Sequence, residues 1–434
     1  EIASCLVGSE MCIRDSCIFV YIVKKEEDIM KKFNKFLSVA VASAMVMAMA
    51  GCGNTDNGSA ATGTNAATES AAASDSAASG SVFKIGGIGP TTGGAAVYGL
   101  AVQHGAEIAV EEINAAGGIN GYQVEFKFQD DEADAEKSVN AYNALKDWGA
   151  QIIDGSTTSG ACIAVTDKTK EDNMFQITPS GSAVECVQYD NNFRVCFSNP
   201  NQGLASAQYI GENGLAEKIA VIYDSSDVYS SGIYEKFAKE AENQPFEIVA
   251  AEAFTADNKT DFSVQLQKAK DAGADMVFLP IYYQESALIL TQAAAMGYAP
   301  KWFSCDGMDG ILGGVDNFDV SLTEGVMLLT PFAADATDDL TQSFVTKYKE
   351  KYGETPNQFA ADSYDAIYVI KAAIEKSGVT PDMSVSDICD GMKAAMTEIT
   401  VDGLTGNGMT WTADGEANKA PKAVVIENGA YKAM

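Results

Sequence analysis

Residues 82–129 read VFKIGGIGPTTGGAAVYGLAVQHGAEIAVEEINAAGGINGYQVEFKFQ, and this stretch decides the fold. The apolar run at 82–89 and the alternating run at 122–129 each predict a β-strand. Between them, residues 98–116 place apolar side chains at the i, i+4, i+7, i+8 and i+11 spacing of one helix face, and Gly117-Gly118 ends that helix. A strand, a helix and a strand in this order predict a βαβ unit with parallel strands.

The same alternation of short apolar runs and helical patterns continues along the chain. Further strands are predicted at 150–154, 175–178, 218–224, 246–254, 275–281 and 325–332. Further helices are predicted at 134–147, 161–172, 202–212, 229–242, 261–272, 284–296, 338–351, 357–376 and 386–397.

The predicted elements form two series, 82–200 and 218–331, and each has the size of one doubly wound domain. We therefore expect an α/β fold with two doubly wound, Rossmann-like lobes. No linker rich in proline and glycine separates the two series, so we expect ordered crossovers between the lobes. Ligands bind such sheets at the carboxyl ends of the strands, which predicts a ligand cleft between the lobes.

The sequence before this body has the pattern of an export signal. A short basic segment begins at Met30, an apolar run follows from 37 to 50, and Gly51-Cys52 comes next. The run is shorter than the roughly 20 residues that span a bilayer. The segment Met49-Ala50-Gly51-Cys52 resembles a bacterial lipobox, so we expect 30–51 to be a lipoprotein signal peptide and Cys52 to receive the lipid. An ordinary signal peptide that contains a cysteine is the alternative.

Residues 53–81 lie between this cysteine and the body, and all of them are small or polar. A segment of this composition does not form a hydrophobic core. We expect 52–81 to be the lipidated cysteine with a flexible linker. Residues 1–29 precede the signal, and CLVGSEMCIRDS within them resembles translated sequencing-adapter read-through. We therefore leave 1–29 out of the fold and expect them not to belong to the native protein.

The charge of the chain argues against several kinds of partner. The formal net charge is −31, and it falls entirely on residues 52–434, because acidic and basic residues balance in 1–51. A body this acidic repels phosphate backbones and anionic lipid headgroups. We expect no nucleic-acid partner and no membrane contact other than the lipid anchor.

The residue types also argue against an enzyme and against a cofactor. A catalytic triad would have to use His104, because it is the one histidine of the chain. His104 lies in a predicted helix and is expected at the surface. GGIGPTTGG (86–94) matches neither of the glycine-rich nucleotide motifs, and the acidic segments at 129–136 and 306–319 do not fit a calcium loop. We expect no catalytic residue, no cofactor and no metal.

The body contains five cysteines at wide spacing, which is neither a disulfide framework nor a metal motif. Cys186 and Cys196 flank a short turn, and a disulfide between them is left open.

Several segments of the body are similar to one known family. GAEIAVEEINAAGGINGYQVEFKFQDDEADAEKSVNAYNAL (105–145) closely resembles the opening βαβ unit of the Leu/Ile/Val-binding proteins, and the resemblance extends over about 82–430. These proteins are the amino-acid receptors of branched-chain ABC importers and have a type I periplasmic binding protein fold. The resemblance implies three crossovers, with 82–201 and 332–403 in lobe 1 and 202–331 and 404–434 in lobe 2.

A zwitterionic amino acid needs hydrogen-bond donors for its carboxylate and an anion for its ammonium. STTSGA (156–161) follows a predicted strand and opens a helix, an arrangement that suits an anion. PSGSA (179–183) also follows a strand. The family resemblance implies that Ser159, Ala161, Ser180 and Ser182 bind the carboxylate; ordinary capping and turn serines are the alternative.

The resemblance also implies the groups that meet the ammonium and the rest of the ligand. Asp306 in FSCDG (303–307) stands where the family commonly has glutamate, and the shorter side chain leaves open whether it contacts the ammonium directly or through water. Tyr98, Tyr229 and Tyr282 stand at positions that line the family's cleft. The alternatives are a solvated loop carboxylate and ordinary packing tyrosines.

From these observations we expect an extracytoplasmic lipoprotein that binds an amino acid by lobe closure and delivers it to ABC permease subunits. Branched-chain amino acids are favoured, and a monomer is expected. The alternative is a ligand-sensing protein of the same fold that is coupled to signalling and not to transport.

Overall fold

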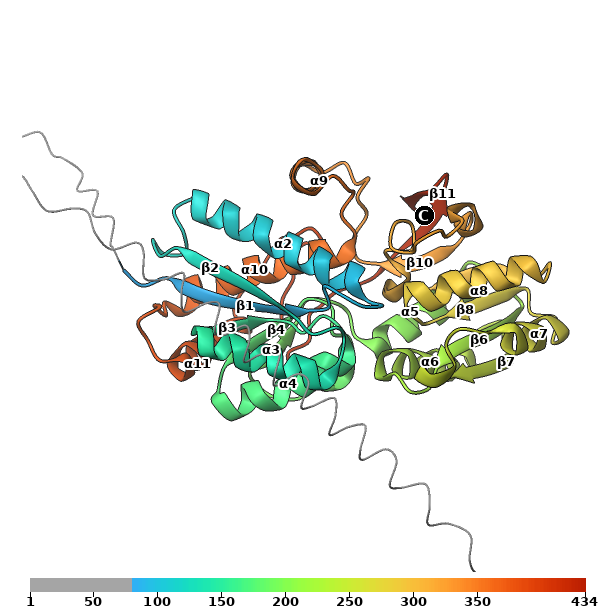
Figure 1. The fold of residues 1–434 in the computed structure, drawn as a ribbon, viewed down its shortest axis with the longest axis horizontal. Coiled ribbons are helices and arrows are strands. Elements are labelled where there is room, and N and C mark those ends of the chain that lie inside the picture. Colours follow the sequence, from blue (N-terminus) through green and yellow to red (C-terminus); the bar gives the residue numbers. More distant parts are fainter. Residues whose placement is uncertain (1–79) are drawn as a thin grey trace, which may run out of the picture. The chain divides into compact units, whose positions relative to one another are not determined.

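The computed structural model describes residues 80–434. The described residues do not include the expected leader, signal peptide, lipidated Cys52 or linker. Within 80–434 the chain forms two sheets with helices on both faces of each, as Figure 1 shows. The expected α/β fold is confirmed.

The first sheet is parallel throughout and has the strand order β2-β1-β3-β4-β5. This is a doubly wound order, in which the chain changes direction between the neighbouring strands β1 and β3. The bounds of its strands are β1 Phe83–Gly89, β2 Val124–Asp130, β3 Ile152–Asp154, β4 Phe175–Thr178 and β5 Asn192–Arg194.

Alternating residues of the first sheet supply two separate layers of core. Ile152 and Phe175 pack toward α2, α10 and α11, whereas Ile153 and Ile88 pack toward α3 and α4. The helices are α2 Ala96–Ala115, α3 Ala135–Trp148, α4 Ser159–Asp172, α10 Gln358–Ser377 and α11 Val385–Met396.

Helices α2 and α10 approach each other so closely that one position requires glycine. A Cβ atom at Gly105 of α2 would lie 2.0 Å from the carbonyl oxygen of Ala360 in α10. This contact joins segments that are far apart in the sequence, and it fixes α10 over the first sheet.

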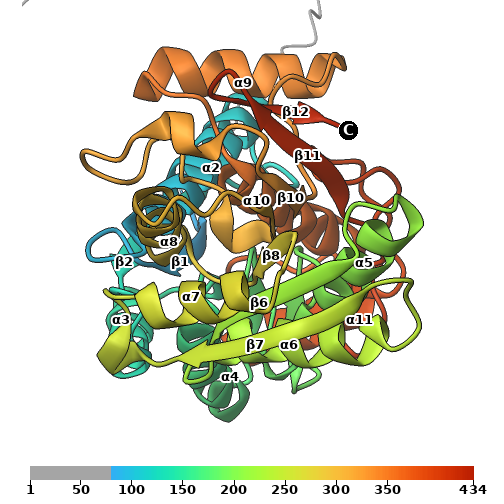
Figure 2. The same ribbon diagram turned by 90° about the vertical axis from the view of Figure 1, so that its right-hand side faces the viewer.

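The second sheet repeats the same doubly wound order and extends it. Strands β7-β6-β8-β9-β10 are parallel, and β11 and β12 add to β10 as an antiparallel pair. Figure 2 turns this sheet toward the viewer. The bounds are β6 Lys218–Asp224, β7 Glu247–Phe254, β8 Met276–Leu279, β9 Lys301–Ser304, β10 Met327–Thr330, β11 Lys422–Glu427 and β12 Ala430–Ala433.

Helices α5 and α6 pack on one face of the second sheet, and α7 and α8 pack on the other. Helix α9 contacts α2 and therefore lies on the side of the first sheet. The bounds of the remaining helices are α5 Asn199–Glu212, α6 Val228–Ala241, α7 Ser263–Asp271, α8 Tyr283–Ala295, α9 Asp339–Tyr352, with the short 3₁₀ turns η1 Val184–Val187, η2 Ala256–Asn258, η3 Asp306–Met308 and η4 Val320–Thr323.

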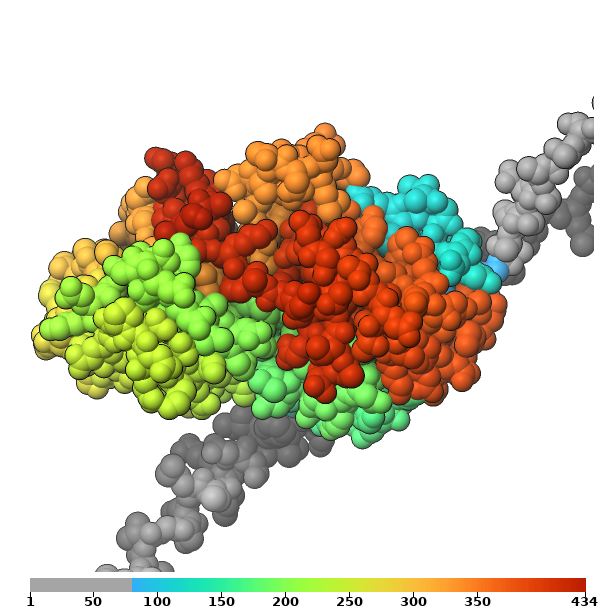
Figure 3. Space-filling model, turned by 180° about the vertical axis from the view of Figure 1, so that it is seen from behind, coloured from blue at the N-terminus to red at the C-terminus, as the bar shows by residue number. Residues whose placement is uncertain are grey.

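The segment before β11 pairs with the first sheet and not with the second. The Trp411 indole donates to the carbonyl of Arg194 at 2.7 Å, and the Leu404 amide donates to Asp365 of α10 at 2.8 Å. In the space-filling view of Figure 3, the red segment that precedes β11 lies beside the orange surface of the preceding part of the chain. We therefore propose that the last segment of lobe 2 begins near Lys422, and not at 404 as the resemblance implied.

Every predicted helix and strand is present, with ends that differ by a few residues. Strands β5, β9, β11 and β12 were not predicted from the apolar pattern, and three of these four have only three or four residues, which is too few to show a period. Among residues 80–434, no helix has the length and apolar character that a membrane crossing needs.

Candidate ligand-binding site

Six of the predicted site residues lie together at the carboxyl ends of strands from both sheets. In the first sheet, Tyr98 comes after β1, and Ser159 and Ser180 come after β3 and β4. In the second sheet, Tyr229, Tyr282 and Asp306 come after β6, β8 and β9. One small cavity is lined by all six together with Thr157, Thr158, Gly307 and Phe359.

The enclosed space of this cavity is about 10 Å³, which is the scale of a single water molecule. Its walls therefore lie nearly in contact. A solute with the size of an amino acid fits only if the walls from the two sheets separate.

The loops after β3 and β4 are tied to each other by their serines. The Ser159 hydroxyl accepts hydrogen bonds from the amides of Ser182 at 3.2 Å and Ala183 at 3.1 Å. In the other direction, the Ser180 hydroxyl donates to the carbonyl of Thr157 at 2.7 Å. The two loops therefore form one rigid wall of the cavity.

This wall carries the amino end of helix α4. The amides of the first helical turn have no partner within the helix, and the helix dipole places partial positive charge there. The Thr158 hydroxyl, at the N-cap, is buried without a hydrogen-bond partner. Such an end suits an anionic group.

Asp306 forms the opposite wall and is held by hydrogen bonds on both carboxylate oxygens. The Tyr229 hydroxyl donates to Oδ1 at 2.7 Å, and the Gln202 side-chain amide donates to Oδ2 at 2.9 Å. Tyr229 in turn accepts from the amide of Gly307 at 2.9 Å. Asp306 is 4% exposed, so its carboxylate is fixed in a position shielded from water.

Burial raises the pKa of Asp306 to about 7, and the nearby Asp362 carboxylate adds to this rise, while the hydrogen bonds from Tyr229 and Gln202 oppose it. Asp362 is itself paired with Lys419 at 2.8 Å, and both side chains are buried. Asp306 has no such cationic partner among the described residues. A cation placed beside it would stabilise the ionised form.

Aromatic rings fill the space between the two walls. Tyr229 stacks on Tyr282 with ring centroids 5.0 Å apart, and Tyr98 packs against Phe359 at 4.3 Å. The Tyr98 hydroxyl donates to the carbonyl of Gly307, which links α2 to the loop that carries Asp306. Tyr283, next to Tyr282, faces away from the cavity and packs on Tyr98.

Ala161 and Ser182 do not line the cavity. Both are buried behind the serine wall, where the Ala161 carbonyl accepts from Ser138 and the Ser182 amide donates to Ser159. Their contact with a ligand stays a prediction. Sequence reasoning missed Phe359, because only the packing of α10 on α2 brings it to the cavity.

The structure also bears on His104 and on the cysteines. His104 is partly exposed at the surface, and the Tyr352 ring of α9 stacks on its imidazole with the ring centroids 3.7 Å apart. The five cysteines of the described part are free, so Cys186 and Cys196 form no disulfide in this structure. Cys186 packs with Cys162. Residues 80–434 contain no cluster of three side chains that could hold a metal ion.

The sequence and the fold are both similar to known binding proteins. Residues 82–430 match the family described as periplasmic binding protein. A Leu/Ile/Val-binding protein homolog from Brucella melitensis is 30% identical over 69% of this chain and 80% of its own length. A leucine-, isoleucine-, valine-, threonine- and alanine-binding protein from Pseudomonas aeruginosa is 30% identical over 68% of this chain and 78% of its length.

Among solved structures, the branched-chain amino acid transporter substrate binding protein from Streptococcus pneumoniae, in complex with isoleucine, superimposes with a TM-score of 0.73. It is 29% identical, and the match covers 81% of this chain and 98% of that protein. The doubly wound sheets, the cavity at their carboxyl ends and these matches lead to one conclusion: the chain belongs to the periplasmic binding protein family, and it resembles that family's Leu/Ile/Val-binding members.

Proposed function

We propose that the protein is the extracytoplasmic solute receptor of an ABC importer, and that it captures a free amino acid between two closing lobes. The observation that carries the proposal is the pairing of opposite electrostatic features across one cavity. The amino end of α4 and its serine wall lie on one side, and the unpaired, buried carboxylate of Asp306 lies on the other.

The serine wall is the proposed site of the α-carboxylate. Ser159 and Ser180 are held by the two loops, and the first-turn amides of α4 supply donors that need no rearrangement. An anion here gains both hydrogen bonds and the favourable end of the helix dipole.

Asp306 is the proposed partner of the α-ammonium. Its side chain is shorter than glutamate, but Gln202 and Tyr229 hold both oxygens in place at the end of β9. A buried carboxylate without a cationic partner costs free energy in the unliganded protein, and a bound ammonium offsets that cost.

The aromatic side chains favour an amino acid with an apolar side chain. Tyr98, Tyr282 and Phe359 supply ring surface to the cavity, and apolar contacts with rings stabilise aliphatic groups by burial. The relatives are named for leucine, isoleucine and valine binding, which supports a branched-chain solute.

A thermal-shift screen of the ligand-stripped full chain against the twenty amino acids and common small acids tests this proposal. A ligand at 1,000 times its dissociation constant should stabilise by about 4 kcal/mol, which raises Tm by several degrees. A shift with leucine, isoleucine or valine supports the proposal, and no shift with any amino acid contradicts it.

The sequence supports the location that we propose, which is the outer face of a bacterial cell membrane, with the protein held by lipid on Cys52. We propose that it acts there as a monomer with permease subunits. Cys52→Ser should release the protein from the membrane fraction, because the expected lipid attachment site is lost and the acidic body repels anionic headgroups. A membrane-bound Cys52→Ser variant would refute the lipid anchor.

A further inference from the structure

A second, larger cavity lies on the other side of the loop that follows Asp306. Its volume is about 500 Å³, within the range of small-molecule sites, and it shares no lining residue with the first cavity. Its walls come from the start of α2, the loop 309–314, the end of β10, the turn before α10 and the strand β12.

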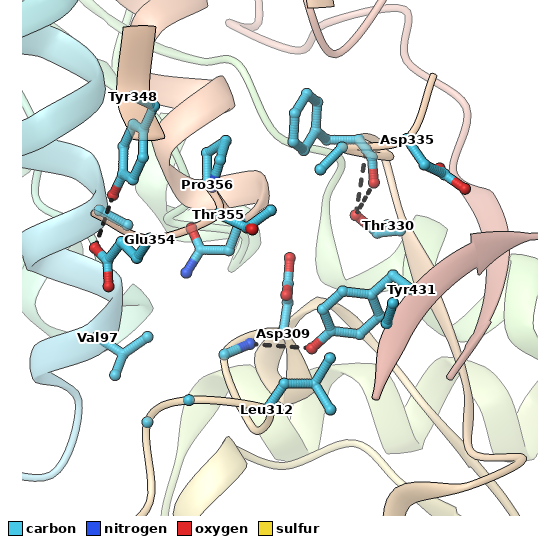
Figure 4. A pocket seen from close by; sticks show the side chains of 18 of the residues that line it. Val97, Asp309, Leu312, Thr330, Asp335, Tyr348, Glu354, Thr355, Pro356 and Tyr431 are labelled. Carbon is cyan, nitrogen blue, oxygen red and sulfur yellow. Dashed lines mark hydrogen bonds between the residues drawn. The ribbon is translucent and has the colours of Figure 1, made fainter. Parts of the chain in front are cut away.

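Much of this second cavity is lined by apolar side chains. Val97 and Leu100 of α2 face Leu312 from the loop and Phe332 after β10. Figure 4 shows Val97 and Leu312 on either side of the floor, with Tyr431 of β12 beside it. An apolar group of a ligand would gain free energy by burial here.

A single buried carboxylate stands in the floor of this cavity. Asp309 is 4% exposed, and its Oδ2 accepts from the Gln358 amide at 2.9 Å, whereas its Oδ1 has no hydrogen-bond partner. Figure 4 shows the carboxylate pointing up into the enclosed space. A buried oxygen without a partner is costly, and a donor in the cavity would satisfy it.

A second polar group lies beside this carboxylate. The Tyr431 hydroxyl accepts from the Gly310 amide at 3.3 Å, and it lies near enough to Asp309 to oppose the rise in the pKa of that carboxyl that burial causes. Thus the floor presents a carboxylate and a hydroxyl to a cavity whose walls are partly apolar.

The charges around the cavity are mostly negative. Asp309 lies inside, the exposed Asp335 and Glu354 lie toward the mouth, and Lys349 is the one basic residue of the lining. Three carboxylates against one ammonium disfavour an anionic ligand. The described residues hold no cluster of metal-ligating side chains, so a bare metal ion does not fit either.

We propose that this cavity is a second binding site, which takes a small organic ammonium, a primary amine that carries an apolar group. The ammonium pairs with Asp309, and the apolar group lies against Val97, Leu100 and Leu312. The assignment does not depend on the solute bound in the first cavity.

The two cavities are mechanically connected through Gln358. Its amide donates to the Asp309 carboxylate, and its side chain donates to the carbonyl of Asp306 at 2.9 Å.

Calorimetric titration of the full chain with 2-phenylethylamine tests the second site, with 2-phenylethanol as the uncharged analogue. One amine per chain should bind, and the alcohol should bind more weakly. Asp309→Asn removes the charge of the carboxylate, and Leu312→Trp fills the cavity. Each variant should weaken amine binding by about tenfold or more. Asp306→Asn should retain it.

The proposal is overturned if the wild-type chain binds no amine, or if both Asp309→Asn and Leu312→Trp bind it as well as the wild type. It is also overturned if Asp306→Asn alone abolishes binding, because the amine would then occupy the first cavity. Leu312→Trp decides the question if Asp309→Asn does not fold. Amine binding without any amino-acid binding would leave the second site standing and contradict the proposed function.

Discussion

At the scale of single residues, Asp306 is the residue on which the proposed binding mode depends most. Its carboxylate is held by Tyr229 and Gln202 in a position where no cation of the described chain reaches it. The protein therefore keeps a buried carboxyl group that no cation of its own described residues neutralises. In our account the α-ammonium of the solute supplies the missing partner.

Asp306→Asn should weaken amino-acid binding by about 2–5 kcal/mol, because the amide keeps the shape of the side chain and loses its charge. Isothermal titration measures this loss. Asp257→Asn is the matched control, because Asp257 is an exposed carboxylate in the 3₁₀ turn η2. This variant should bind as the wild type does. Equal affinities for Asp306→Asn and the control would remove Asp306 from the site.

Binding should also depend on pH near neutrality. Burial raises the pKa of Asp306 to about 7 in the unliganded protein, and a bound ammonium would lower that pKa. Affinity should therefore be full above pH 7 and fall by up to about tenfold per unit as the pH drops below 7. Titrations from pH 5 to 8 measure the slope.

Asp309 and Asp362 also titrate in this range, since burial raises the pKa of each to about 6. The Asp306→Asn variant separates their effects from that of Asp306. It should lose the dependence centred near pH 7, and an unchanged pH profile in that variant would assign the effect to another group.

At the scale of secondary-structure elements, the loops after β3 and β4 depend on one serine. The Ser159 hydroxyl accepts from two backbone amides of the second loop, and each of these amides is buried. The amino end of α4 and the second loop are thereby held as a single unit.

Ser159→Ala should lower the free energy of unfolding by about 1–3 kcal/mol, because two buried amides lose their acceptor. Urea denaturation measures this change. Ser343→Ala, at an exposed position of α9, should change stability little and is the control. Equal stabilities of the two variants would show that the loops are held by other contacts.

The elements themselves could largely be predicted from the sequence, and their contacts could not. The apolar spacing in 98–116 predicted α2, and Gly117-Gly118 predicted its end. Phe359 shows the limit: it lies in a predicted helix, but only the close approach of α10 to α2 at Gly105 brings its ring to Tyr98. Local patterns carry no information on such a contact.

The same limit applies to single strands and to the last crossover. Strand β5 has three residues and shows no period, and Trp411 reaches Arg194 of that strand from 217 positions away. A segment whose partners are this distant cannot be assigned to a lobe from its own residues. For this reason the resemblance alone implied a boundary at 404, whereas the contacts of 404–419 with the first sheet lead us to propose one near Lys422.

At the scale of the whole molecule, the first cavity is too small for an amino acid while its walls are in contact. Entry therefore requires the elements of the two sheets to move apart, and the bound solute should bring them together again. The Tyr98 hydroxyl, which donates to Gly307, is one contact that opening must break.

Small-angle X-ray scattering should show this motion. In our account the ligand-stripped chain samples open arrangements, and a saturating amino acid should reduce its radius of gyration by selecting the closed one. Asp306→Asn at the same ligand concentration should show no reduction. Identical scattering of the wild-type chain with and without bound ligand would contradict lobe closure.

The central claim is that one cavity recognises both charged ends of an amino acid, and one calorimetric comparison tests it most directly. The ligand-stripped chain is titrated with leucine and with 4-methylpentanoate, which is leucine without its ammonium group. The account predicts that leucine binds and that the acid binds at least about 100-fold more weakly, since the partner of Asp306 is missing. Equal affinities, or no binding of leucine or any other amino acid, would contradict it.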